Sequence, residues 1–147
     1  MRVYLDNCCY GRPYDDQTQL RISLETQAKL SIQHSIVEGK IELASSFFVV
    51  YENGKKKNPM VKDQITAFIK NNSKVYVDHT AIPDLKNIIM QIESTGIKAL
   101  DASHIAAAIY SGCDCLITTD DRILRYETDK IKIIDPIQFI RMEEVKE

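Results

Sequence analysis

Short apolar runs alternate with longer stretches of helical periodicity along the whole chain. Runs of four to six residues are typical of buried strands, and five are predicted, at residues 2–5, 41–45, 74–79, 115–119 and 130–135. Helices are expected between them. Such alternation predicts a parallel sheet, because a strand can return parallel to its neighbour only through a crossover, which is usually a helix. The chain is therefore expected to have an α/β fold with helices on both faces of a parallel sheet.

The expected helices lie within residues 15–40, at 47–53, 58–72, 81–95 and 101–111, near 120–127, and from Pro136 onward. Gly39 and Gly96 are expected to end two of them, because glycine tolerates the left-handed backbone that closes a helix. The longest helix carries apolar side chains at four-residue steps, which predicts one buried face. That face would consist of Leu20, Leu24, Ala28, Ile32 and Ile36.

The length and net charge of the chain limit the kinds of protein that it can be. A chain of 147 residues without repeats or a linker is expected to form one domain, 1–147. A net charge of −2 does not indicate a nucleic-acid binder, so an anionic substrate would need a local basic patch or bound cations. No apolar run approaches the roughly 18 residues that span a bilayer, and no signal peptide is evident. A cytoplasmic protein without a membrane partner is expected.

The four cysteines are spaced as Cys8-Cys9 and Cys113-x-Cys115. Structural zinc sites usually pair their cysteines across two to four intervening residues, which neither spacing provides. Buried, reduced thiols are the expectation.

Four carboxylates stand out by their positions. Asp6 ends the first predicted strand, and Asp120 ends the fourth, two residues after Thr118. Glu52 follows the apolar run "SFFVVY", and Asp101 begins an alanine-rich helix. The carboxyl ends of parallel strands meet at one sheet edge, which is where open α/β sheets bind ligands. Asp6 and Asp120 are therefore expected at that edge.

Structural roles could also explain three of these carboxylates. Asp101 and Asp120 could cap helices, and Glu52 could point to solvent. Asp6 is the hardest to explain in this way, because the only nearby partners for a buried carboxylate there are Asn7 and backbone. If the fold gathers these groups, however, they repel one another unless they share protons or hold a cation. Oxygen ligands without paired cysteine or histidine select Mg²⁺ or Mn²⁺, and such ions also bind substrate phosphates. The pattern indicates metal-assisted phosphodiester hydrolysis.

The chain resembles the PIN domain nucleases, including the VapC-type toxins, over nearly its whole length. The similar motifs are "VYLDN", "FFVVYEN" and "ALDASHIAAAIYSGCDCLITTDDRIL", of which the third is the most specific. The resemblance implies a PIN-like three-layer sandwich. Its five-stranded parallel sheet would have the order 3-2-1-4-5, with Asp6 and Asp120 on adjacent strands.

The resemblance also implies a site and partners. Asp6, Glu52, Asp101 and Asp120 would be the catalytic residues and would bind one or two Mg²⁺ or Mn²⁺ ions. Supporting roles would fall to residues beside them: Asn7, Thr118, which could orient an acid or a water, and Asp121. The implied function is an endoribonuclease, the toxin of a type II toxin–antitoxin pair, with RNA as substrate, a homodimer, and a small antitoxin that blocks the cleft. The alternative is a catalytically silent PIN-fold module that binds RNA or protein.

Two further sets of residues have both a functional and an ordinary structural interpretation. Basic side chains near the acidic motifs could contact RNA phosphates or simply solubilise the surface: Arg12, Lys55, Lys56 and Arg122. His104 lies three residues after Asp101 on the same helical face, and a packed or locally hydrogen-bonded histidine is expected there rather than a metal ligand.

Overall fold

The predicted sheet is present, with all of its strands parallel. The computed structural model describes residues 1–146, and within them five strands form one sheet of order β3-β2-β1-β4-β5. After β1, the chain adds β2 and then β3 on one side of β1, and it then adds β4 and β5 on the other side. The strand order therefore reverses between β1 and β4. The strands are β1 (Arg2–Leu5), β2 (Glu42–Ser46), β3 (Ser73–Val77), β4 (Cys115–Ile117) and β5 (Lys132–Ile134).

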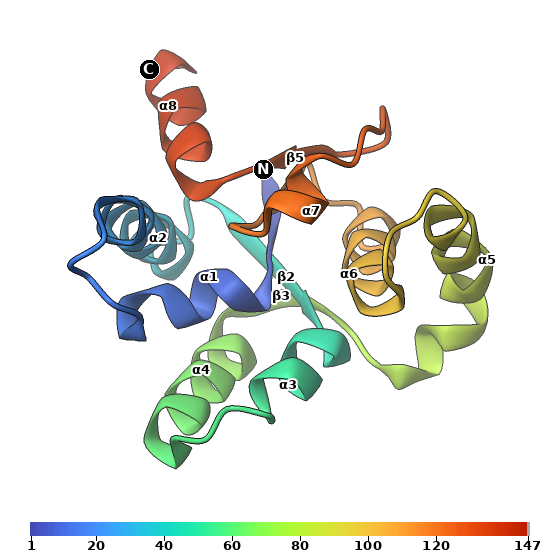
Figure 1. Ribbon diagram of the computed structural model, residues 1–147, viewed down its shortest axis with the longest axis horizontal. Helices are drawn as coiled ribbons and strands as arrows, with labels where there is room; N and C mark the ends of the chain where they lie inside the picture. The colour runs from blue at the N-terminus through green and yellow to red at the C-terminus, as the bar shows by residue number, and fades with distance from the viewer. Residues whose placement is uncertain (147) are drawn as a thin grey trace.

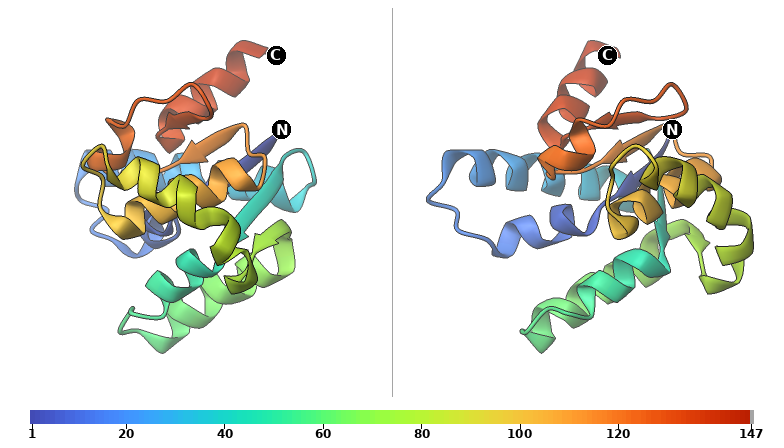
Figure 2. Two further views of the ribbon diagram at one scale, coloured as in Figure 1. Left: turned by 90° about the vertical axis from the view of Figure 1, so that its right-hand side faces the viewer. Right: turned by 45° about the vertical axis from the view of Figure 1, so that its right-hand side comes forward.

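Helices cover both faces of this sheet, as the alternating sequence pattern predicts. Figure 1 shows α1 and α2 on one side of the strands and α5 and α6 on the other, and the views in Figure 2 agree. The helices are α1 (Asn7–Gly11), α2 (Leu20–Val37), α3 (Phe47–Asn53), α4 (Pro59–Asn72), α5 (Ile82–Glu93), α6 (Ala99–Tyr110), α7 (Asp121–Leu124) and α8 (Pro136–Lys146), with 3₁₀ turns at Arg12–Tyr14 and His79–Ala81. None of these helices is both long and apolar enough to cross a membrane.

The core lies where α6 packs against the central strands. Tyr4 and Leu5 of β1 and Leu116 of β4 are completely buried. The small side chains of α6 let its backbone approach the sheet closely, because alanine adds little volume between helix and strand. The buried residues of α6 are Ala102, Ser103, His104, Ile105, Ala106, Ala107 and Ala108.

The prediction for the apolar face of α2 was partly wrong. Leu20 is 73% exposed and Leu24 is 44% exposed, whereas Ile36 is buried, as are Ala28 and Ile32. Four residues turn a helix by about 400°, so each step moves the side chain about 40° further around the axis. The first ten residues of α2 therefore bury Glu25 and Lys29 in place of the leucines.

Two boundaries near the sheet edge differ from the predictions. The fourth strand ends at Ile117 rather than residue 119, although the Thr118 amide still donates to the Ile134 carbonyl of β5 over 3.0 Å. Helix α1 was not predicted. It begins directly after β1, and Asp6 caps it by accepting a hydrogen bond from the Asn7 amide. The chain therefore turns sharply at Asp6 and leaves that carboxylate at the sheet edge.

Candidate active site

A cavity of about 270 Å³ lies at the point where the strand order reverses. All four predicted principal acids line it, although they come from four different places in the chain: the end of β1, α3, the first turn of α6, and the loop after β4. This is the edge at which open α/β sheets bind ligands. The lining residues are Asp6, Asn7, Cys8, Glu52, Lys98, Leu100, Asp101, Asp120 and Arg122.

Asp6 is the most firmly held of the acids and is only 4% exposed. Its Oδ1 accepts from the Asn7 amide over 2.7 Å. Its Oδ2 accepts from the Thr118 hydroxyl over 2.8 Å and from the Cys8 thiol over 3.3 Å. Thr118 Oγ1 also accepts from the Asp120 amide over 3.0 Å. Thr118 therefore connects two of the acids and fixes the orientation of one.

His104 lies between Asp6 and Glu52, and it is completely buried. Its Nε2 is hydrogen-bonded to Glu52 Oε1 and lies 3.7 Å from Asp6 Oδ1. Its Nδ1 lies 2.8 Å from the Tyr4 hydroxyl, which in turn is 2.6 Å from Ser46 Oγ. A packed or locally hydrogen-bonded histidine was expected at this position. The contact with Glu52 was not predicted, because Glu52 is 52 residues away in the chain.

Asp101 and Asp120 form the other half of the cavity, with Arg122 between them. Arg122 contacts Asp120 through Nε at 3.3 Å and Nη2 at 3.2 Å, and its Nη2 lies 4.0 Å from Asp101. Asp120 caps α7 by accepting from the Arg122 amide. Asp101 is not a cap, because Lys98 occupies that position of α6 and Asp101 lies in the first turn. Helix capping therefore does not explain the position of the Asp101 carboxylate.

The surroundings shift the pKa values of these groups in different directions. Burial and the charge of Asp120 raise the pKa of Asp101, and Arg122 only partly opposes them. Burial also acts to raise the pKa of Asp120, but hydrogen bonds from Arg122 outweigh it and lower that pKa. Burial acts to lower the pKa of His104, yet its hydrogen bond with Glu52 and the charges of Asp6 and Glu52 raise it overall. The cavity therefore favours bound positive charge.

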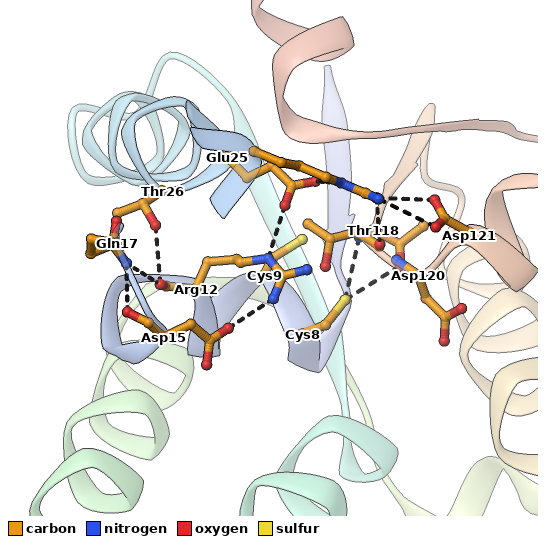
Figure 3. A network of polar contacts seen from close by, with 12 residues as sticks. Cys8, Cys9, Arg12, Asp15, Gln17, Glu25, Thr26, Thr118, Asp120 and Asp121 are labelled. Carbon is orange, nitrogen blue, oxygen red and sulfur yellow. Dashed lines mark hydrogen bonds and ion pairs between the residues drawn. The ribbon is translucent and has the colours of Figure 1, made fainter. Parts of the chain in front are cut away.

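Asp121 belongs to a separate network. Its carboxylate accepts from Arg21 Nη2 over 3.0 Å, and Arg21 also donates to the Thr119 carbonyl and to Glu25. Glu25 is buried and accepts from Arg12 as well, over 2.9 Å. In Figure 3 the side chains of Asp120 and Asp121 point in opposite directions. Asp121 does not line the cavity, and its supporting role stays a prediction.

The structure distributes the predicted basic residues unevenly. Arg122 lines the cavity, together with a further basic residue, Lys98. Arg12 instead pairs with Glu25 and Asp15. Lys55 lies over the Tyr51 ring, 4.6 Å from its centroid, and Lys56 lies beside Gly11. A phosphate at the cavity would meet Lys98 and Arg122 first.

The donor atoms of the cavity fit a divalent cation. One ligand atom each from Asp6, Glu52 and His104 lie within 4.8 Å of one another. Asn7 Oδ1 is a buried oxygen without a hydrogen-bond partner among the described residues. Among the described residues that line the cavity, four are carboxylates and two carry a basic side chain, Lys98 and Arg122. Clustered carboxylates and an unpaired oxygen form the donor set that hard and borderline divalent ions bind.

Comparisons with known proteins identify similar folds. No protein-family model matches the chain, and no curated protein matches it by sequence. The solved structure of VapBC2 from Rickettsia felis bound to a promoter DNA fragment is similar with a TM-score of 0.55 and 13% identity, covering 90% of this chain and 97% of that one. The structure of FitAcB from Neisseria gonorrhoeae is similar with a TM-score of 0.58 and 15% identity, covering 91% and 97%. The chain therefore shares the α/β fold of these proteins.

Proposed function

We propose that this protein is a divalent-metal-dependent endoribonuclease and the toxin of a type II toxin–antitoxin pair. One observation carries the proposal: Asp6, Glu52, Asp101 and Asp120 line one cavity where the strand order reverses. Side chains from four distant positions gain nothing for folding by being clustered, because like charges repel. A site that binds a cation and a phosphodiester explains why they converge.

The residues of the cavity divide into those that would hold the metal and those that would meet the substrate. Asp6, Glu52, Asp101 and Asp120 would hold one or two Mg²⁺ or Mn²⁺ ions, which supply charge neutralisation at phosphate and a more acidic bound water. Thr118 keeps the Asp6 carboxylate oriented. Lys98 and Arg122 are placed to contact the anionic RNA backbone, where such contacts contribute affinity independent of sequence.

The proposed partners rest on the fold comparisons. The name of the Rickettsia felis protein, VapBC2, corresponds to the VapC-type toxins that the sequence motifs resemble. Each of the two alignments spans at least nine-tenths of this chain. We therefore assign to this chain a small antitoxin partner. The family resemblance of the sequence, rather than these comparisons, adds a homodimeric assembly to the proposal.

RNA cleavage tests the proposal. Purified protein, free of copurified partner, would be incubated with a labelled mixed RNA pool in Mn²⁺, in Mg²⁺ and in chelator. We expect cleavage with metal only, and loss of cleavage in Asp6→Asn and Asp120→Asn. Asp129→Asn, which changes an exposed acid that does not line the cavity, should cleave like the wild type. Intact RNA in every wild-type lane, from a folded sample, would favour the catalytically silent binding module.

A further inference from the structure

One ring nitrogen of His104 faces two carboxylates of the candidate site. Its ring is completely buried, yet Nε2 is directed at the carboxylates of Asp6 and Glu52 rather than at apolar atoms. The three candidate donor atoms lie within 4.8 Å of one another. A single ion between them could contact all three after small side-chain adjustments.

The opposite side of the ring has the arrangement that metal-binding histidines require. A ligating imidazole normally hydrogen-bonds through its second nitrogen, which fixes the tautomer and the ring orientation. Here Nδ1 lies 2.8 Å from the Tyr4 hydroxyl, and that hydroxyl lies 2.6 Å from Ser46 Oγ. All three residues are completely buried. When Nδ1–H donates to the Tyr4 hydroxyl, and that hydroxyl donates to Ser46 Oγ, the lone pair of Nε2 is left facing the cavity.

Aromatic packing holds the ring in this orientation. The Tyr4 and His104 ring centroids are 5.9 Å apart at an interplanar angle of 62°, and those of Phe48 and His104 are 6.2 Å apart at 74°. Both are edge-to-face arrangements, which are favourable for aromatic pairs. The imidazole is restricted on two sides before any ion binds, so binding would not have to order it.

We propose that His104 Nε2 is a nitrogen ligand of the divalent ion, together with Asp6 and Glu52, and that it makes the site prefer Mn²⁺ to Mg²⁺. This inference rests on the proposed function, since it concerns the metal of that site. Imidazole suits ions such as Zn²⁺ and Fe²⁺ best. Mn²⁺ begins the same first-row series and accepts a nitrogen ligand more readily than Mg²⁺, which is bound almost entirely by oxygen. Four carboxylates alone would not distinguish the two ions in this way.

A competing role for His104 is purely positional. In that case the imidazole hydrogen-bonds Glu52 and never contacts the ion. The two roles differ in one observable, a bond between the metal and nitrogen. Pulsed electron paramagnetic resonance of bound Mn²⁺ detects a directly coordinated ¹⁴N through its hyperfine coupling, and labelling with ¹⁵N-histidine changes the coupling. The wild-type protein suffices for this measurement, so it does not depend on a variant folding.

Histidine variants identify which residue supplies the coordinated nitrogen. We expect the coupling in the wild type and in His34→Gln, whose histidine is exposed on α2, and its loss in His104→Gln. Tyr4→Phe keeps the buried ring but removes the hydroxyl from Nδ1. Loss of such an outer partner typically weakens metal binding by about 10–100-fold. We expect a weakening of at least about tenfold for Mn²⁺ in Tyr4→Phe and a smaller one for Mg²⁺, measured by calorimetric titration.

The outcomes separate this inference from the proposed function. Bound Mn²⁺ without nitrogen coupling, or equal Mn²⁺ affinity in the wild type and in folded His104→Gln, overturns the ligand role of His104 and leaves a metal-dependent nuclease standing. Absence of Mn²⁺ binding together with RNA cleavage that persists in chelator overturns both.

Discussion

The Thr118 hydroxyl donates a hydrogen bond to Asp6 Oδ2 over 2.8 Å and joins the ends of β4 and β1 at the candidate site. The hydroxyl oxygen of Thr118 also accepts a hydrogen bond from the Asp120 amide over 3.0 Å. One buried side chain thus holds the geometry between two of the acids, which come from distant parts of the sequence. The site is consequently sensitive to the residue at position 118.

Replacing this threonine should impair activity more than stability. Thr118→Val keeps the shape but leaves the Asp120 amide without its acceptor, and Asp6 Oδ2 with only the Cys8 thiol. We expect the free energy of unfolding to fall by about 1–3 kcal/mol and RNA cleavage at saturating substrate to slow by about tenfold or more. Thr118→Ser keeps the hydroxyl and should restore most of the rate. Equal rates for the valine and serine variants would exclude a positioning role.

The buried Glu25 should matter for folding rather than for chemistry. Its side chain is 2% exposed and accepts from Arg12 Nε at 2.9 Å and Arg21 Nε at 3.3 Å. Glu25→Gln removes the charge that both guanidinium groups face, and we expect it to lower the free energy of unfolding by about 2–3 kcal/mol.

Asp15→Asn is the matched control for Glu25, because Asp15 also pairs with Arg12 but is 43% exposed. Exposed ion pairs contribute little to stability, so the free energy of unfolding of this variant should fall by less than about 1 kcal/mol. Urea denaturation of the two variants measures the difference. Similar losses in both would mean that the burial of Glu25 does not decide its contribution.

Lys29 should make stability depend on pH. It is 6% exposed, with Nζ over the rings of Tyr10 and Phe68, and burial lowers its pKa to about 8. Below pH 8 the Lys29 side chain is charged in the folded and unfolded states alike. The free energy of unfolding is then reduced by the full cost of burying that charge. Between pH 8 and its unfolded pKa of about 10.4, the folded protein binds fewer protons than the unfolded chain, and stability rises with pH.

Lys29→Met removes this dependence. At pH 7 we expect the variant to be more stable than the wild type by up to about 3 kcal/mol, and the difference to shrink as the pH approaches 10. Lys130→Met, which changes an exposed lysine, should follow the wild type at every pH. Chemical denaturation from pH 7 to 10 measures all three proteins. A constant difference between the wild type and Lys29→Met would contradict the lowered pKa.

Arg122 should compete with the metal. Its guanidinium occupies both oxygens of Asp120 and approaches Asp101. Arg122→Gln removes this internal cation, so we expect Mn²⁺ to bind about two- to fivefold more tightly in the absence of RNA, as suits a half-exposed ion pair. The KM for RNA should rise, because a phosphate contact is lost. Arg125→Gln is the control, since Arg125 donates to the Asp121 carbonyl and does not line the cavity. Unchanged metal affinity in Arg122→Gln would show that Arg122 does not compete.

The sequence predicted the strands and the acids because their signals are local. The apolar run that ends at Asp6 and the one before Asp120 are readable within a few residues. The strand order, by contrast, came from the family resemblance. Helix α1 was missed because five residues containing two cysteines and a glycine carry no periodicity. The wrong face of α2 came from treating a four-residue step as if it returned to the same side.

The contacts that complete the candidate site could not be predicted because they are distant in sequence. His104 meets Glu52, which is 52 residues away, and Thr118 meets Asp6, which is 112 residues away. The one local signal for His104 was its position three residues after Asp101, on the same helical face. That signal does not reveal which element covers the face, and only the folded chain brings Glu52 of α3 there.

The location of a bound ion shows whether the acidic cavity is a metal site. Crystals grown in Mn²⁺, at a concentration that supports RNA cleavage, would be measured at the manganese absorption edge. We expect an anomalous peak inside the cavity, within coordinating distance of Asp6, and its absence in Asp6→Asn crystals of the same form. A wild-type cavity without a peak, in a protein that cleaves RNA under those conditions, would contradict this expectation.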